Sequence, residues 1–259
     1  MRIPFVKGSA CGNDFLIVDG AYAGNDIAAL TRRMCDRNNG VGADGVEWLY
    51  PSETADARIR LVNADGSDAE LSGNGTRCVA AHIAFESGLQ RILIATDAGV
   101  KTCELTSREG PLFEFTTAMG APKVSGAVEL AIGGNVVTGV PVSMGNPHFV
   151  VFVNEFQPGW QALAEGIQRQ PLFPQGTNVE FVRVLNSGEI EIRIFERGAG
   201  ETLSSGTGSS ASAAAAIATG RVMRTLQVHT PGGSQQVRWE DELFLTGPAR
   251  LVCRGEFFV

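Results

Sequence analysis

Two short loops in this chain carry residues whose types and order suit the binding of an anion. Each reads Ser-Gly-x-Gly, at Ser72–Gly75 and again at Ser205–Gly208, and a run of small, helix-compatible residues follows each. Backbone N–H groups at a helix N-terminus are unpaired and lie at the positive end of the helix dipole, so such a turn suits a carboxylate or a phosphate. No lysine follows either loop as in a phosphate-binding loop, which favours a carboxylate. A purely structural tight turn is the alternative.

Polar residues precede each loop. Asn63 and Asp65 stand before the first, and Glu196 with Arg197 stands before the second. Taken singly, Asn-x-Asp-Gly-Ser is typical of an ordinary turn, an adjacent Glu and Arg of a solvated pair, and His148 of a satisfied core histidine. Their place beside two candidate anion sites favours a binding site for a small ligand.

The two loops belong to an internal repeat. A Gly-Asn pair before an apolar run occurs at Asn13 and again at Asn146, a separation of 133 residues (146 − 13). Ser72 and Ser205 are also 133 residues apart (205 − 72). One such match is readily explained by chance similarity between Gly-rich loops. Two matches at the same spacing are much harder to explain by chance. We therefore expect two diverged copies of one α/β unit, each presenting one loop.

The elements that position the loops are mostly strands. Period-two alternation and apolar runs predict strands at 58–62, 92–96, 112–116, 179–184, 189–195 and 243–246. Helices are predicted at 26–35, 78–85, 160–167 and 211–219. This pattern predicts an α/β (α+β) chain with two pseudo-symmetric lobes, each a curved, mostly antiparallel sheet around one central helix. We place the lobes at 1–125 and 126–259, with the C-terminal strand free to pair back onto the first lobe.

Composition narrows the classes of partner. The chain has 259 residues, with 28 acidic against 21 basic side chains and a formal net charge of −7, which disfavours a nucleic acid or an anionic membrane as partner. No signal-peptide core or membrane-length apolar run is present, so we expect a cytoplasmic protein. Five widely spaced cysteines and three histidines form no metal-ligand pattern, so we expect no metal site.

At this point the motifs, taken together and in order, resemble the diaminopimelate epimerases over nearly the whole chain. The matching segments are Gly12-Asn13-Asp14-Phe15, Asn63-x-Asp65-Gly66-Ser67, Gly73-Asn74-Gly75-x-Arg77-Cys78, Ser143-Met144-Gly145-Asn146-Pro147-His148, Gly176-Thr177-Asn178-Val179-Glu180-Phe181, Glu196-Arg197-Gly198-x-Gly200-Glu201-Thr202 and Gly206-Thr207-Gly208. The resemblance implies the fold of that family and a pyridoxal-independent epimerase that inverts one Cα of diaminopimelate in lysine and peptidoglycan biosynthesis.

The resemblance also implies roles for individual residues. Substrate-binding side chains would be Asn13, Asn63, Asn146, Asn178, Glu196 and Arg197, while the backbone amides of Gly73, Asn74, Gly206 and Thr207 would receive the carboxylate at the reacting centre. The partner is then a small amino-acid substrate, with a homodimer left open.

The chain departs from the family where the chemistry is done. The two catalytic cysteines that the family places before Gly-Asn-Gly and Gly-Thr-Gly are replaced by Ser72 and Ser205. A serine hydroxyl is a far weaker acid than a thiol and needs an adjacent base, for which the family suggests His148 near Ser72 and Glu196 near Ser205. A smaller departure is Gly45, where some members carry a substrate-contacting glutamine.

Three hypotheses follow from this departure. The first is a diaminopimelate epimerase by lineage whose thiols were replaced, by natural drift or by deliberate substitution. The second is a related isomerase or dehydratase with a more acidic substrate proton, since relatives in the proline racemase and phenazine-biosynthesis groups work with one thiol fewer or with a carboxylate. The third is a non-catalytic amino-acid-binding protein. Detection of turnover separates the third hypothesis from the other two.

Overall fold

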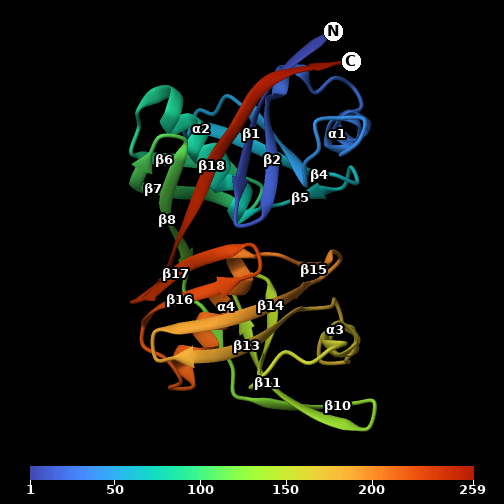
Figure 1. Ribbon diagram of the computed structural model, residues 1–259, viewed down its shortest axis with the longest axis vertical. Helices are drawn as coiled ribbons and strands as arrows, with labels where there is room; N and C mark the ends of the chain where they lie inside the picture. Colours follow the sequence, from blue (N-terminus) through green and yellow to red (C-terminus); the bar gives the residue numbers. More distant parts are fainter. The chain divides into compact units, whose positions relative to one another are not determined.

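The computed structural model describes residues 1–259, which form two compact units. Unit 1 comprises residues 1–117 and 247–259, and unit 2 comprises residues 118–246. The sequence analysis places the boundary between the two lobes at residues 125/126, whereas the two units of the structure separate at residues 117/118. The last strand, β18 (Leu243–Phe258), begins in unit 2 and continues in unit 1, where it pairs with β1 (Arg2–Ala10) and places the two termini next to each other (Figure 1).

Unit 1 is a curved mixed sheet in which most neighbouring strands are antiparallel. From β18 and β1 the order continues through β2 (Asn13–Asp19), β3 (Gly45–Tyr50), β4 (Ala57–Asn63), β6 (Arg91–Thr96), β7 (Gly99–Glu109) and β8 (Leu112–Gly120), and β8 pairs with β18 again. The short β5 (Asp68–Ala69) adds to β4. The sheet therefore closes on itself, with parallel pairing at β2–β3 and β4–β6.

Unit 2 repeats this arrangement. Its order is β9 (Lys123–Val124), β11 (Asn135–Ser143), β12 (Pro147–Phe152), β13 (Asn178–Asn186), β14 (Glu189–Glu196), β16 (Thr225–Thr230), β17 (Gly233–Trp239) and the start of β18, with β10 (Val128–Ile132) beside β11 and β15 (Gly200–Thr202) beside β14. The two parallel pairs recur at β12–β13 and β14–β16.

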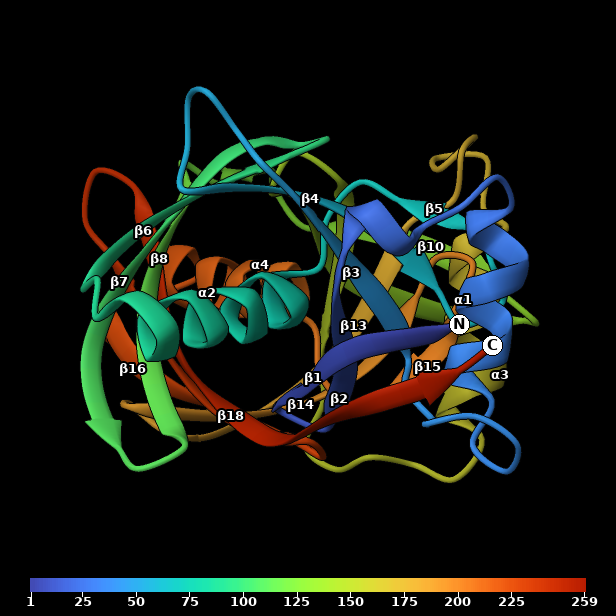
Figure 2. The ribbon, with the colours of Figure 1, turned by 90° about the horizontal axis from the view of Figure 1, so that it is seen from above.

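Each parallel pair is connected through a helix, because parallel strands need a long crossover. The helices α1 (Ile27–Cys35) and α3 (Trp160–Gln168) make one crossover in each unit, and α2 (Gly73–Ser87) and α4 (Gly206–Ala218) make the other. Figure 2 shows the strands of unit 1 around α2. The helix α4 contacts β9, β11, β12, β13, β14, β16 and β17. None of the helices is long and apolar enough to cross a membrane.

The central helices are built from small residues because the surrounding strands leave little room. In α4, Ala211 and Ala213–Ala216 are fully buried and pack against Val182, Ile192 and Val228. In α2, Val79–Ala81 are buried against Ile59, Phe113 and Phe115. Burial on all sides matches a helix that is not amphipathic.

The structure confirms the predicted fold class, and the repeat extends to the order of the elements. The first residues of β3 and β13, Gly45 and Asn178, are 133 positions apart, as are those of α2 and α4, Gly73 and Gly206. The central helices begin five residues before the predicted starts at 78 and 211, so each Gly-x-Gly segment forms the first helical turn. A serine N-cap and packing from the sheet outweigh the low helix propensity of glycine there.

Packing around α4 predicts a size limit that a matched pair of substitutions can test. Ala214→Leu should destabilise the protein by about 1–3 kcal/mol, because the added atoms have no space among fully packed strands. Ala218→Leu, at the exposed last residue of the same helix, should have little effect. Urea unfolding of both variants measures the difference, and equal midpoints would contradict the packing described here.

Candidate active site

The Ser72 loop of unit 1 is a helix N-cap. Ser72 has an extended backbone, and its Oγ accepts the N–H of Gly75 at 3.0 Å. The backbone oxygen of Ser72 accepts the N–H of Thr76 at 2.8 Å. The N–H groups of Gly73 and Asn74 have no acceptor within the protein, as is usual for the first turn of a helix. Two amides at the N-terminus of a 15-residue helix are therefore free to bind an anion.

A chain of hydrogen bonds fixes the side chains beside this loop. Buried Arg77 donates to Asn74 Oδ1 at 2.5 Å, Asn74 Nδ2 donates to Asn13 Oδ1 at 2.6 Å, and Asn13 Nδ2 donates to Asp44 Oδ2 at 3.2 Å. The bond between Asn13 and Asn74 joins the start of β2 to the first turn of α2. The remaining residue predicted in unit 1, Asn63, instead donates from Nδ2 to Ser67 Oγ at 3.0 Å.

The Ser205 loop of unit 2 has the same local geometry. Ser205 Oγ accepts the N–H of Gly208 at 3.2 Å, and the N–H groups of Gly206 and Thr207 are free. Asn146 Nδ2 lies 3.5 Å from Thr207 Oγ1, matching the bond between Asn13 and Asn74 in unit 1. Each unit thus joins an Asn in the connection between two antiparallel strands to the second residue of its central helix.

His148 forms a buried pair with a carboxyl group. Its Nδ1 lies 2.7 Å from Glu180 Oε1, and its Nε2 lies 3.0 Å from Asn146 Oδ1. A carboxamide oxygen only accepts a hydrogen bond, so Nε2 is the donor in the bond to Asn146. Burial raises the pKa of Glu180, the charge of Glu196 adds to the rise, and His148 opposes it.

The remaining predicted residues of unit 2 lie around the same strand ends. Asn178 Oδ1 accepts the N–H of Arg197 at 2.9 Å, and Asn178 Nδ2 donates to the carbonyl of Pro147 at 3.1 Å. Arg197 is exposed, and its Nη1 donates to the carbonyl of Gln175 at 3.2 Å. Because the Asn178 side chain bonds both neighbouring segments, it fixes where Arg197 leaves the sheet.

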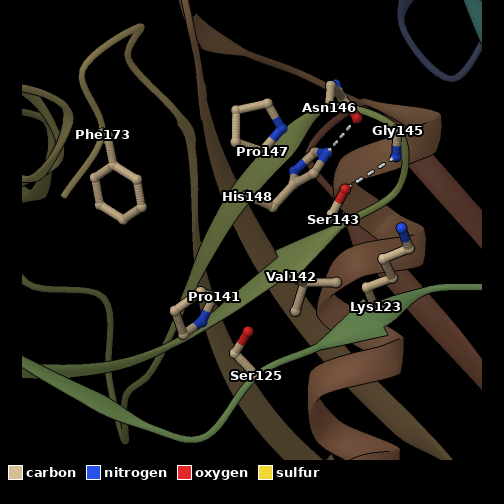
Figure 3. Close-up of a pocket in the computed structure, with 10 residues that line it drawn as sticks. All are labelled: Lys123, Ser125, Pro141, Val142, Ser143, Gly145, Asn146, Pro147, His148 and Phe173. Carbon is tan, nitrogen blue, oxygen red and sulfur yellow. Dashed lines mark hydrogen bonds between the residues drawn. The ribbon is translucent and has the colours of Figure 1, made fainter.

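A pocket of about 410 Å³ in unit 2 reaches this group of residues. Figure 3 shows Asn146 and His148 at one end, where the imidazole points to the carboxamide, and Ser125 with Pro141 at the other. The Ser143 hydroxyl accepts the N–H of Gly145 and orders the turn between them at 3.3 Å. The pocket is therefore lined by the residues of the His148–Asn146 hydrogen bond.

Two buried carboxyl groups under the loops were missed from the sequence. Glu47 on β3 and Glu180 on β13 are 133 positions apart, and both are fully buried. A β-carbon at Gly75 would overlap Glu47 Oε1, and one at Gly208 would lie 3.0 Å from Glu180 Oε1. The second glycine of each loop therefore makes room for a carboxyl group. A charged residue at the same place in two apolar strands was the available signal.

Chemically, each unit offers two free amides for a carboxylate, a serine hydroxyl at the helix cap and a carboxyl group under the first turn. Burial raises the pKa of Glu47 to about 8, so this group holds a proton at neutral pH. Unit 2 adds an imidazole. These groups suit binding of a carboxylate together with proton transfer at a nearby atom.

Comparison with known proteins gives one family. The model described as diaminopimelate epimerase matches residues 5–124 and 140–252. The diaminopimelate epimerase of Moorella thermoacetica is 39% identical over 276 aligned residues, with 98% of each chain covered. That of Halothermothrix orenii is 38% identical over 282 aligned residues, covering 100% of this chain and 99% of the relative.

Solved structures with low sequence identity share the fold. A phenazine biosynthesis protein of the PhzF family from Bacillus anthracis has a TM-score of 0.75 at 18% identity, with both chains fully covered. A hydroxyproline epimerase from Agrobacterium vitis, solved with trans-4-hydroxy-L-proline bound, has a TM-score of 0.72 at 17% identity, covering 98% of this chain and 92% of that one.

The contact between Glu47 and Gly75 predicts a coupled pair of substitutions. Gly75→Ala should destabilise the protein by about 1–3 kcal/mol despite the better helix propensity of alanine, because the new methyl group meets the carboxyl. Gly208→Ala should cost less, and Glu47→Ala combined with Gly75→Ala should recover part of the loss. Urea midpoints of the double-mutant cycle measure the coupling, and additive effects would exclude a direct contact.

The raised pKa of Glu47 predicts how stability depends on pH. The unfolded chain releases this proton near pH 4.5, whereas the folded chain holds it until about pH 8, so unfolding becomes easier as the pH rises through that window. Glu47→Gln removes this dependence. Its stability relative to the unsubstituted protein should rise between pH 4.5 and pH 8 by an amount on the order of a few kcal/mol. A difference in urea midpoint that stays constant with pH would contradict it.

Proposed function

This chain belongs to the diaminopimelate epimerase family, and we propose that it binds diaminopimelate and interconverts the L,L and meso forms in lysine and peptidoglycan biosynthesis. The observation that carries the proposal is the pair of capped helix N-termini, at Ser72 and Ser205, each with two free amides. The relatives are named diaminopimelate epimerase, and they align with this chain over nearly the full length of both sequences.

The first part of the proposal concerns the carboxylate at the reacting carbon. The free amides of Gly73, Asn74, Gly206 and Thr207 would donate to it, and the positive ends of α2 and α4 would stabilise the charge that develops when Cα loses its proton. Preorganised amides of this kind are among the strongest stabilisers of developing negative charge. Asn13, Asn63, Asn146, Asn178, Glu196 and Arg197 would hold the other polar groups of the substrate.

The second part concerns the proton itself. Ser72 and Ser205 would serve opposite faces of the same Cα, so that one removes a proton while the other delivers one. His148 would assist Ser72, and Glu196 would assist Ser205. The epimerisation then needs no pyridoxal and no metal, because the helix ends supply the stabilisation of the carbanion and the side chains supply the protons.

The two serines set the rate in this proposal. A hydroxyl is a poor proton acceptor near neutral pH compared with a thiol, whose unperturbed pKa is about 8.5. Each serine oxygen also accepts an N–H of its own helix, which occupies one of its two lone pairs. A serine at these two positions therefore stabilises the start of the helix, but it is a poorer acid–base group than a cysteine.

The exchange of serine for cysteine at both positions tests the proposal. The double variant Ser72→Cys, Ser205→Cys should gain Cα–deuterium exchange with L,L- and meso-diaminopimelate, by about 10²-fold or more, since a matched acid–base group contributes on this scale. Its unfolding free energy should fall by about 1 kcal/mol per helix, because sulfur is a weak cap acceptor.

Each single variant is the internal control for this gain. Because inversion needs a base on one face and an acid on the other, each single variant should gain little. If the double variant folds and binds diaminopimelate without exchanging the Cα proton, the proposed reaction is wrong and another substrate has to be sought. Binding without turnover would favour an amino-acid-binding protein.

Binding gives a second, independent prediction. Calorimetry without metal or pyridoxal should show saturable binding of diaminopimelate, and Arg197→Ala should weaken it by about tenfold or more through loss of a charge-assisted hydrogen bond. Arg169→Ala is the matched control, because Arg169 is an exposed arginine of unit 2 that pairs with Glu165 on α3. Equal affinities of the two variants would remove Arg197 from the site.

A further inference from the structure

The two units differ at one position that faces the buried carboxyl groups. In unit 2, Glu180 lies under the Ser205 loop and pairs with His148. In unit 1, Glu47 occupies the equivalent place under the Ser72 loop, and the position equivalent to His148 is Phe15 (148 − 133). The strand registers agree, since Ile17 lies opposite Glu47 and Val150 lies opposite Glu180. Unit 1 therefore has the carboxyl group without the imidazole.

Glu47 has no hydrogen-bond partner in the folded chain. Both carboxyl oxygens are buried and have no hydrogen-bond partner. Burial of an unpaired polar group lowers the free energy of unfolding. Its neighbours supply no compensating charge. Ile17 faces it from β2 and Leu61 from β4, and on α2 it meets Gly75 with the Cys78 thiol as a titratable neighbour, whose pKa burial raises.

The same carboxyl group is directed at the Ser72 cap. A β-carbon added at Gly75 would overlap Glu47 Oε1 and would lie 3.2 Å from Ser72 Cβ. The Ser72 oxygen accepts one N–H, while its hydroxyl proton has no acceptor within the protein. An unpaired carboxyl group and an unpaired hydroxyl proton therefore lie on either side of a glycine that has no side chain to separate them.

We propose that Glu47 is a positioning residue that exchanges a proton with Ser72 from beneath the first turn of α2, in addition to the assistance proposed for His148. The inference rests on the proposed epimerisation and names a further group for it. In this proposal the Ser72 side chain rotates out of the cap, and its hydroxyl then meets the carboxyl oxygen across Gly75.

The proton transfer balances without any further reactant. When Ser72 Oγ accepts the proton of the substrate Cα, its own O–H bond breaks and that proton forms an O–H bond with ionised Glu47. The electron pair of the Cα–H bond stays on Cα until a proton arrives on the opposite face. In the reverse direction protonated Glu47 returns its proton to Ser72 as Ser72 donates to Cα. A pKa of about 8 leaves both forms of Glu47 accessible near neutral pH.

A thiol placed at position 72 reports this exchange without reference to epimerisation. In a Ser72→Cys, Cys253→Ser protein, the introduced thiol is the most accessible one, because the other four cysteines are buried. The rate of its alkylation by iodoacetamide should depend on two ionisations, since the charge on Glu47 changes the pKa of the thiol. With Glu47→Gln added, one ionisation should remain, and with Glu47→Asp two should remain.

The alkylation profile also separates proton exchange from a purely structural role. A role in packing alone would change the rate at every pH by the same factor, and pH profiles of the same shape with glutamate and glutamine at position 47 would overturn the proposal. If Glu47→Gln does not fold, infrared titration of the unsubstituted protein, with its glutamates labelled by ¹³C, replaces it. A buried carboxyl that titrates near pH 8 and persists in the Glu180→Gln variant supports the proposal, and full ionisation at pH 6 overturns it.

Turnover then tests the link to the reaction. In the Ser72→Cys, Ser205→Cys protein, Glu47→Gln should lower Cα–deuterium exchange by at least about tenfold. Glu104→Gln, which removes an exposed carboxylate of β7 in the same unit, should leave the exchange unchanged. Absence of exchange with Glu47 intact would contradict the proposed function alone. Exchange that is unaffected by Glu47→Gln would contradict this inference alone.

Discussion

A helix that is buried along its length by a curved sheet can meet a ligand only at its ends, and α4 of unit 2 is such a helix. The side chains of α4 from Ser209 to Ala216 are enclosed by strands, so they are small and take no part in recognition. The unpaired amides that a helix carries at its start are then the N–H groups of α4 that remain open to a ligand. The serine caps, the asparagines and the buried carboxyl groups gather at that end for this reason.

The same constraint explains why the glycines of the loops are needed. The first turn of α2 lies against β3, and Glu47 occupies the space that a side chain at position 75 would require. In unit 2 the corresponding carboxyl group is drawn to His148 and stands further from Gly208. Unit 1 has Phe15 where unit 2 has His148, so Glu47 lacks the hydrogen-bond partner that Glu180 has.

Much of this architecture could be predicted from the sequence, because its signals are local or repeat at a fixed spacing. Alternating strands, the Gly88 stop of α2 and the spacing of 133 between Ser72 and Ser205 led to the fold class. The start of the central helices was missed, since glycine is a poor helix former and a cap is recognised only with its partner. Glu47 was missed because its burial depends on packing against α2, which begins about 30 residues later in the chain.

The path of β18 has a consequence for how the chain folds as it is made. All of unit 2 lies between residues 118 and 246, whereas the sheet of unit 1 closes only when residues 247–258 pair with β1 and β8. On the ribosome, unit 2 is therefore synthesised completely while unit 1 still has an open edge at β1. An open strand edge is prone to pair with another chain, so the first-made half of this protein is the last to be protected from aggregation.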